Sequence, residues 1–131
     1  MDRKLVSRKE FDSVIGLDAE RRYRYFVKRV ADSQTAWSLW DGSAWFVYRS
    51  SDGRQFLPLW PAKEYGDACA IDAWGAATTR PIAVDRLIGE FLPAMSAEGV
   101  FPAVFPTPSG EGIEIPADAL QRDLEEELSE Y

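Results

Sequence analysis

The residues best suited to chemistry lie where a proline-containing strand is expected to run into a helix. Trp60-Pro61 ends this strand, and Lys63 follows two residues later. A proline at the first helical position leaves backbone N–H groups unpaired, and a lysine beside them favours an anion. A small pocket for an anion or a peptide terminus is therefore predicted, lined by Trp40, Trp60, Lys63, Glu64 and Tyr65. In the competing interpretation, Trp60 and the following tyrosine fill the core while the charged side chains face water.

The chain contains no histidine. This excludes nucleophile systems that need an imidazole base, and zinc or non-haem iron sites built on imidazole. The single cysteine, Cys69, is interpreted as a small buried apolar residue, because Lys63 is the only cation close to it in sequence. Gly110-Glu111-Gly112 has no accompanying Lys-Ser/Thr pair and is interpreted as a hairpin turn rather than a phosphate cradle. No cofactor and no metal site are expected.

Charge is unevenly distributed in this chain, whose net charge is −7. Residues 1–31 carry nine Lys or Arg against five Asp or Glu, whereas residues 118–131 carry one Arg against six acids. This polarity indicates that the two terminal helices attract each other, within one chain or between the chains of a homodimer. The acidic face of the last helix is either solvated or a docking surface for a basic partner protein, formed by Asp123, Glu126, Glu127 and Glu130.

The second expected helix has a basic face with Tyr25 among arginines, a pattern found in nucleic-acid patches. Phosphate contacts need a net basic face, so nucleic acid is not an expected partner of this acidic chain. The N-terminus lacks the apolar core of a secretion signal, and no apolar run approaches the roughly 20 residues of a membrane span. With one cysteine, the composition fits a reducing compartment. We expect a cytoplasmic protein.

Helix signals occur along the whole chain. Helix starts are predicted at the capping residues Ser7 and Asp18 and at the prolines Pro61 and Pro116. A further helix over residues 84–98 ends at Gly99. Within it, Pro93 lacks an N–H and would crowd the carbonyl four residues earlier, which predicts a kink.

Strands are predicted at residues 35–41, 44–49, 55–60, 80–84, 100–106 and 112–115, the first two joined by a tight turn at Asp41-Gly42. Pro58 cannot donate a ladder hydrogen bond, so its strand is expected at a sheet edge or with that position open to solvent. The order of elements predicts an α+β fold. We expect a single domain over residues 1–131, with a flexible N-terminus over residues 1–6 and an antiparallel meander of about five strands flanked by four to five helices.

Three motifs are more specific than these element signals. They are Trp37-Ser-Leu-Trp-Asp41, Phe56-Leu-Pro-Leu-Trp-Pro-Ala-Lys-Glu-Tyr65 and Val104-Phe-Pro-Thr-Pro-Ser-Gly110. With these motifs the chain resembles a bacterial family of unknown function, number 2750, for which no activity is assigned. The order of two strands, a Leu-Pro-aromatic element and a helix is also similar to secretion-enhancer-like and immunity-type bacterial domains. That second similarity concerns the fold, which is a poor guide to function.

Two functions remain open from the sequence. The first is a binding domain without catalytic activity, which engages a basic protein through the acidic face and the strand near Pro58, as an immunity protein would. The second is a small-ligand-binding or enzymatic domain that uses the pocket beside Trp60, where a carboxylate serves as general base in place of histidine.

Overall fold

Two capped helices begin the described part of the chain, which is residues 5–131 of the computed structural model. They are α1 (Arg8–Ile15) and α2 (Ala19–Ser33). The side chains of Ser7 and Asp18 each accept a hydrogen bond from a backbone N–H in the first turn of their helix, so both capping predictions are confirmed. The expected flexible N-terminus lies outside the described residues as far as residue 4.

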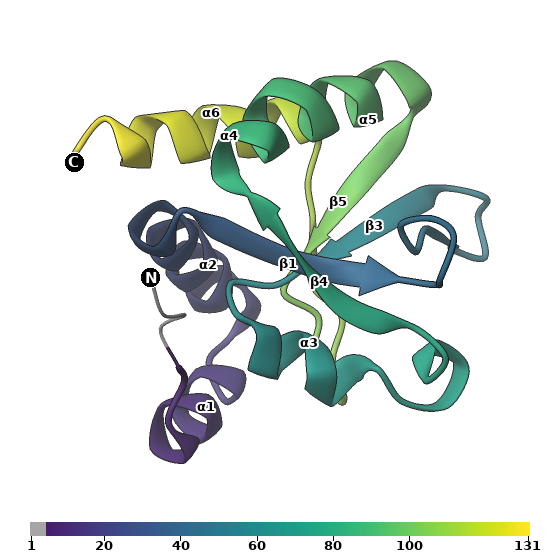
Figure 1. The fold of residues 1–131 in the computed structure, drawn as a ribbon, viewed down its shortest axis with the longest axis horizontal. Coiled ribbons are helices and arrows are strands. Elements are labelled where there is room, and N and C mark those ends of the chain that lie inside the picture. Colours follow the sequence, from purple (N-terminus) through teal and green to yellow (C-terminus); the bar gives the residue numbers. More distant parts are fainter. Residues whose placement is uncertain (1–4) are drawn as a thin grey trace.

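In the described residues, six strands form two sheets. A two-stranded antiparallel sheet contains β1 (Thr35–Trp40) and β4 (Thr78–Ala83). A four-stranded sheet has the order β2-β3-β5-β6, with β2 (Tyr48–Arg49), β3 (Gln55–Leu59), β5 (Val100–Val104) and β6 (Ile113–Glu114). An antiparallel bridge between Trp37 and Trp60 joins the sheets, so β1 crosses the end of β3 near the centre of Figure 1.

The α+β class and the predominance of antiparallel pairing are confirmed, but the prediction of one meander is wrong. β3 and β5 pair in parallel, and β1 pairs with β4 along its whole length. The turn at Asp41-Gly42 forms, but the expected hairpin is limited to one bridge between Trp40 and Trp45. The residues that follow form β2, which pairs with β3 instead. Parallel strands need a long crossover, and α3, β4 and the helices after it supply one here.

Pro58 is buried in β3, an inner strand of the four-stranded sheet, so the expectation of an edge or solvent-exposed position is wrong. The carbonyl of Leu59 accepts a hydrogen bond from the N–H of Phe105, just after β5. Backbone groups of successive residues in a strand point to alternate sides, so the backbone of Pro58 faces away from β5. On that side β2 has already ended, and Ser38 of β1 donates its hydroxyl to the Pro58 carbonyl. No N–H is required of the proline there.

The helices after β3 are α3 (Lys63–Cys69), the 3₁₀ turn η1 (Asp72–Trp74), α4 (Val84–Arg86), the π-helical turn η2 (Leu87–Phe91), α5 (Leu92–Glu98) and α6 (Ala117–Leu128). α4, η2 and α5 form one continuous helix that ends at Gly99, whose φ of 74° is the left-handed cap predicted for it. Pro93 produces a wide turn rather than a simple kink. The Leu92 N–H bonds the carbonyl of Leu87, five residues back, and this widening accommodates the proline.

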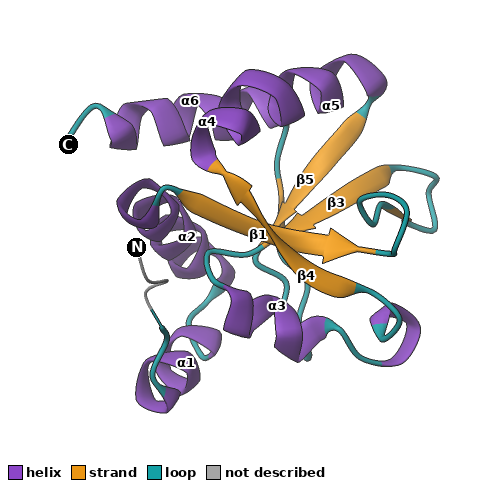
Figure 2. Cartoon of the chain, in the orientation of Figure 1, coloured by secondary structure: helices purple, strands orange, loops and turns teal. Residues whose placement is uncertain are grey.

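The helices lie on both sides of the crossing strands (Figure 1). In this view the α4–α5 helix and α6 lie together above the strands and α1 and α3 lie below them, while α2 lies beside the strands and contacts α6; the secondary structure is drawn in Figure 2. Between them, large apolar side chains form a core that water does not reach. Its largest fully buried members are Trp60, Tyr65, Phe26, Phe56 and Phe105.

Candidate functional site

Two of the five residues predicted to line a pocket are core residues. Trp60 is fully buried, and its indole Nε1 donates a 2.8 Å hydrogen bond to the carbonyl of Pro106. Tyr65 is 2% exposed, and its ring packs against Phe105 and stacks on Phe11. For these two rings, the structure matches the competing interpretation from the sequence.

The other three predicted pocket residues lie away from this core. Lys63 forms a 2.7 Å ion pair with Asp67, one turn later on α3. A Glu64 carboxylate oxygen accepts a hydrogen bond from the backbone of Val6. Trp40, at the end of β1, packs edge-to-face against another tryptophan. The structure therefore does not gather the five residues into one pocket.

The helix start at Pro61 is wrong by two residues. α3 begins at Lys63 after an extended Ala62, which has no side chain able to cap the helix. Trp60 pairs with Trp37 in an extended β-bridge, so the backbone becomes helical only after residues 61–62.

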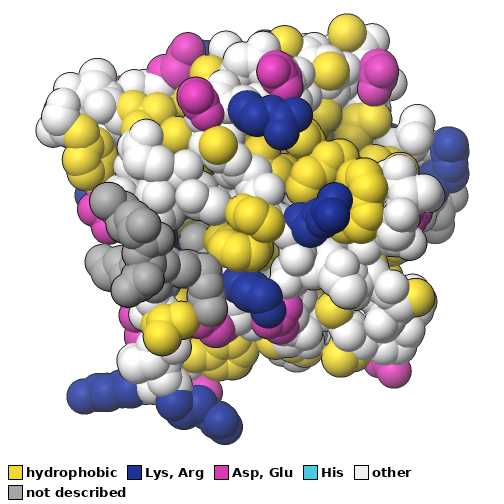
Figure 3. Space-filling model, viewed as in Figure 1, with side chains coloured by type: hydrophobic (Ala, Val, Ile, Leu, Met, Phe, Trp, Pro, Cys, Tyr) yellow, Lys and Arg dark blue, Asp and Glu magenta, His cyan; other side chains and the backbone are white. Residues whose placement is uncertain are grey.

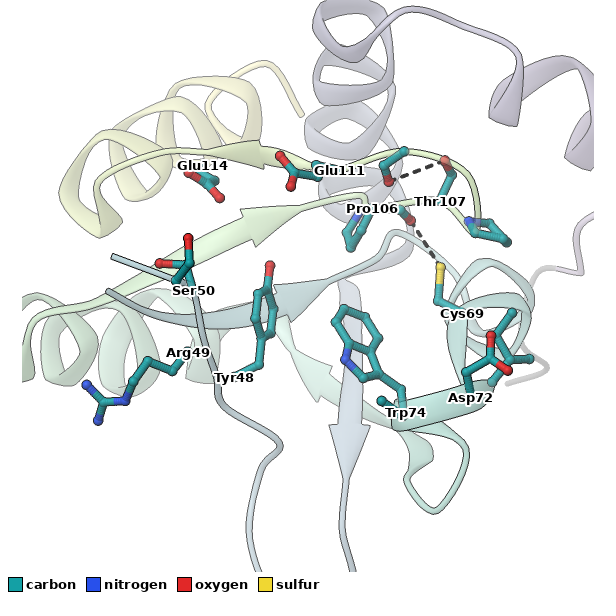
Figure 4. Close-up of a pocket in the computed structure, with 15 residues that line it drawn as sticks. Tyr48, Arg49, Ser50, Cys69, Asp72, Trp74, Pro106, Thr107, Glu111 and Glu114 are labelled. Carbon is teal, nitrogen blue, oxygen red and sulfur yellow. Dashed lines mark hydrogen bonds between the residues drawn. The ribbon is translucent and has the colours of Figure 1, made fainter. Parts of the chain in front are cut away.

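Three loops instead enclose a cavity that the sequence did not indicate, here called the loop cavity. Its volume is about 490 Å³. One wall is the end of β2 and the turn after it, the second is the segment from the end of α3 through η1, and the third is the connection from β5 to β6 (Figure 4). Its lining residues with rings or charges are Tyr48, Arg49, Asp72, Trp74, Glu111 and Glu114.

Arg22 of α2 holds the third wall in place. Its guanidinium donates to the backbone carbonyls of Leu17, Phe105 and Glu111 at 2.7, 3.3 and 3.2 Å, and the residue is only 8% exposed. Phe105 itself has a φ of 60°, the left-handed region that non-glycine residues rarely occupy. A charged donor anchored in the protein stabilises this unusual backbone turn.

The Pro106 carbonyl connects the loop cavity to the core. It accepts the Trp60 indole N–H and also the Cys69 thiol, at 3.3 Å (Figure 4). Burial raises the pKa of the Cys69 thiol to about 11, so this sulfur is protonated near neutral pH. A protonated, buried thiol is a poor nucleophile, which agrees with the structural interpretation of this cysteine.

Aromatic rings and carboxylates face each other across the loop cavity. The rings of Tyr48 and Trp74 lie 5.1 Å apart, and the Tyr48 hydroxyl points toward the side that carries Glu111 and Glu114 (Figure 4). Burial, and then the charges of Glu114 and Glu111, raise the pKa of Tyr48 to about 12. The phenol thus stays neutral, and the negative potential at its hydroxyl would favour a positive group.

A second hollow is the apolar groove, with a volume of about 300 Å³, between the α4–α5 helix and the strands. Trp40, Trp45 and Phe91 form a chain of edge-to-face contacts beside it, with centroid distances of 5.4 and 5.5 Å. Arg80 lies over the Trp40 ring at 4.5 Å, and Figure 3 shows cationic atoms on a hydrophobic patch in this region. The groove is lined by Trp45, Val47, Leu57, Glu90, Phe91, Ala94, Met95, Glu98 and Val100.

A third groove, of about 290 Å³, lies between α2 and α6. It contains all four predicted docking residues, Asp123, Glu126, Glu127 and Glu130. Arg24 and Lys28 of α2 line the same groove, and the Tyr23 hydroxyl donates to Asp123. Basic residues of α2 and acidic residues of α6 therefore line one groove within a single chain.

Among residues 5–131, no cluster of three or more Cys, Asp or Glu side chains has the arrangement of a metal site. None of the helices in this part of the chain combines the length and apolar character needed to cross a membrane.

The protein is a small α+β domain with three hollows on its surface, which are formed by loops, helices and strands. A family model described as a protein of unknown function (DUF2750) matches residues 23–124. The chain belongs to this family, and α1 lies before the matched region. Comparison with curated proteins and with solved structures finds no match.

Proposed function

We propose that this chain is a cytoplasmic bacterial domain that binds a basic partner protein without catalysing a reaction, as an immunity protein does. The apolar groove carries this proposal. It combines the partly exposed rings of Trp45 and Phe91 with Met95 and with Val47, which is 42% exposed. Aromatic residues and methionine are enriched in protein interfaces, and tryptophan supplies many of their energetic hot spots.

The charge of the partner follows from the charges around the groove. The whole chain has a net charge of −7, and Glu90 and Glu98 line the groove. Arg86 pairs with Glu90 at 3.1 Å, whereas the structure gives Glu98 no ion pair with any of residues 5–131. Complementary charge speeds association and weakens with added salt. A basic protein therefore fits this surface better than an acidic one.

A second candidate function, small-ligand binding, is favoured by the loop cavity. Its volume of about 490 Å³ lies within the range of ligand pockets, roughly 300–1,000 Å³. The cavity also reaches Pro106, the hydrogen-bond partner of Trp60, so it lies close to where the sequence placed a pocket. An enzymatic use would have to rely on carboxylates, because the Cys69 thiol is protonated near neutral pH.

The test of protein binding compares two charge-introducing variants on exposed apolar residues. Val47→Asp changes the groove, and Leu5→Asp changes a residue that is 68% exposed elsewhere. We expect the wild-type chain and Leu5→Asp to retain the same basic protein from host lysate at low salt. For that purified partner, Val47→Asp is expected to weaken binding about 30-fold, the effect of a 2 kcal/mol hot spot.

Three results would contradict the proposal. They are retention of no protein, retention of acidic proteins only, and equal loss of the partner by Val47→Asp and Leu5→Asp. Thermal melts of both variants check that each has kept its fold.

A further inference from the structure

We propose that the loop cavity is a binding site for a cationic group, a guanidinium or an alkylammonium, which sits against the Tyr48 and Trp74 rings beside the Glu111 carboxylate. The inference rests on the second candidate function for the existence of a ligand and names its chemistry. It is independent of the apolar groove, which is a different surface with different lining residues.

The aromatic part of the site is a continuous wall. Tyr48 and Trp74 lie 5.1 Å apart with their planes tilted by 40°, and each also contacts Phe46 behind them. The face of an aromatic ring carries negative charge density and attracts a cation within about 6 Å. A tryptophan and a tyrosine at the same cavity therefore provide the surface that guanidinium and ammonium groups prefer.

The charged part of the site is negative. Among residues 5–131, the structure gives neither the Asp72 nor the Glu111 carboxylate an ion pair. Glu114 is partly neutralised by Arg54, at 3.3 Å. Arg49, the one cationic lining residue, turns its guanidinium away from the cavity and donates to the carbonyl of Gly53 (Figure 4).

The positions of these groups support each other. The charges of Glu114 and Glu111 contribute to the raised pKa of Tyr48. Both carboxylates are therefore close enough to interact with a charged group bound at the Tyr48 hydroxyl. A cation on the ring face near that hydroxyl would be attracted by both carboxylates. An anion would meet the same carboxylates without compensation.

The cavity walls are held before any ligand arrives. Arg22 fixes the loop that carries Glu111, and the Pro106 carbonyl is tied to both Trp60 and Cys69. A preformed site loses little conformational entropy on binding. The cation could belong to a free amine or to a side chain of a basic protein, and the two sources share the same recognition chemistry.

The experiment follows the indole N–H signal of Trp74 by NMR of the ¹⁵N-labelled chain, with the signal assigned from Trp74→Phe. The probes are N-acetylarginine amide, its neutral isostere N-acetylcitrulline amide, agmatine, and an arginine flanked by glycines in a blocked pentapeptide. We expect saturable shifts with the cations and about tenfold weaker binding of the citrulline compound. Tighter binding of the pentapeptide than of agmatine would assign the cation to a protein, and the reverse to a small amine.

Two matched variants separate the site from the overall charge. Glu111→Gln removes one negative charge inside the cavity while leaving the backbone carbonyl that Arg22 holds, and Glu125→Gln removes one from the exposed face of α6. We expect about fivefold to tenfold weaker arginine binding for Glu111→Gln and no change for Glu125→Gln.

Equal effects of the two variants, or no saturable shift with any cation at about 10 mM, would overturn the inference. So would citrulline binding as tight as arginine binding, although that result would leave small-ligand binding standing. In that case, the class of ligand is wrong and the cavity is still a site.

Discussion

At Arg22, one guanidinium donates to three backbone carbonyls that belong to two distant parts of the chain. A lysine ammonium is a single point charge and cannot reach all three, so Arg22→Lys leaves buried acceptors unpaired. Each unpaired buried acceptor costs about 1–3 kcal/mol, so we expect the free energy of unfolding to fall by about 2–4 kcal/mol. Urea denaturation measures this change.

The control for Arg22→Lys is its neighbour, Arg21→Lys. Arg21 is exposed and makes only a 3.8 Å contact with Asp18, so this change should alter stability by less than about 0.5 kcal/mol. If the two variants unfold at the same urea concentration, the three hydrogen bonds from the Arg22 guanidinium do not add to the stability of the fold.

Single residues also show where sequence reasoning succeeded. The burial of Cys69 was predicted from its position on the inward side of its helix, and the structure confirms it. Tyr48, Trp74 and Glu111 were missed as site residues because they come from β2, η1 and the connection between β5 and β6, which only the folded chain brings together. No periodicity or spacing signals such a meeting. Until the topology is known, a glutamate and a tryptophan in separate segments of the chain cannot be told from ordinary surface residues.

Among the elements, α1 is attached to α2 through the side chain of Glu10 and packs on Tyr65 through Phe11. Glu10 accepts hydrogen bonds from Arg29, at 2.9 Å, and from the Tyr25 hydroxyl. Arg29 is 8% exposed, and removal of a partner from a buried ion pair is costly. Because Glu10 is itself 34% exposed, we expect Glu10→Ala to lower the free energy of unfolding by about 2 kcal/mol rather than the 3–5 kcal/mol of a fully buried pair.

A second residue on the same helix provides the comparison for Glu10→Ala. Asp12 pairs with Arg8 at 3.4 Å on the exposed side of α1, and Asp12→Ala should change stability by no more than about 0.5 kcal/mol. Hydrogen exchange of α1 amides distinguishes local release of the helix from global unfolding. Unchanged protection in Glu10→Ala would mean that Phe11 and its stacking partner alone hold α1.

Helices could be predicted from the sequence and strand partners could not. Caps such as Ser7, Asp18 and Gly99 act within one turn, so the sequence contains all that is needed to recognise them. Pairing of β1 with β4, or of β3 with β5, depends on contacts between residues far apart in the chain. Pro58 was misread for this reason, because the side on which its missing N–H falls is decided by the neighbouring strands.

For the whole molecule, stability should fall at alkaline pH. Burial raises the pKa of Tyr48 to about 12, with contributions from Glu114 and Glu111, and burial also raises the pKa of Tyr23 and Tyr65. Unfolded tyrosines titrate near pH 10, so the folded chain holds these protons more tightly than the unfolded chain does. The contribution of these tyrosines to stability is therefore fully retained below pH 10, and that of Tyr48 is lost as the pH rises from 10 through 12.

Urea midpoints measured from pH 8 to pH 12 test this dependence, and tyrosinate absorbance follows the titration directly. Tyr48→Phe should flatten part of the fall between pH 10 and 12, since it removes one of the retained protons. A midpoint that stays constant across that interval would show that the phenols titrate alike in both states.

The charge polarity of the whole chain predicts an attraction between its two ends, and the sequence leaves open whether one chain or two satisfy it. Arg24 and Lys28 line the same groove as the four acids of α6. This arrangement reduces the potential that α6 can offer to a partner. The charges at the apolar groove come from the α4–α5 helix, and those at the loop cavity come from β2, η1, β6 and the loop before β6; sequence position gave no indication of either group.

The three bonds of Arg22 also constrain how the chain is made. Arg22 and Phe105 are separated by 83 positions, so on a translating ribosome the guanidinium emerges well before the carbonyl it will hold. At synthesis rates of about 5–20 residues per second, this interval lasts on the order of ten seconds. During that time the α2 arginine must remain hydrated, and the loop around Phe105 cannot settle until residues 105–111 have left the ribosome.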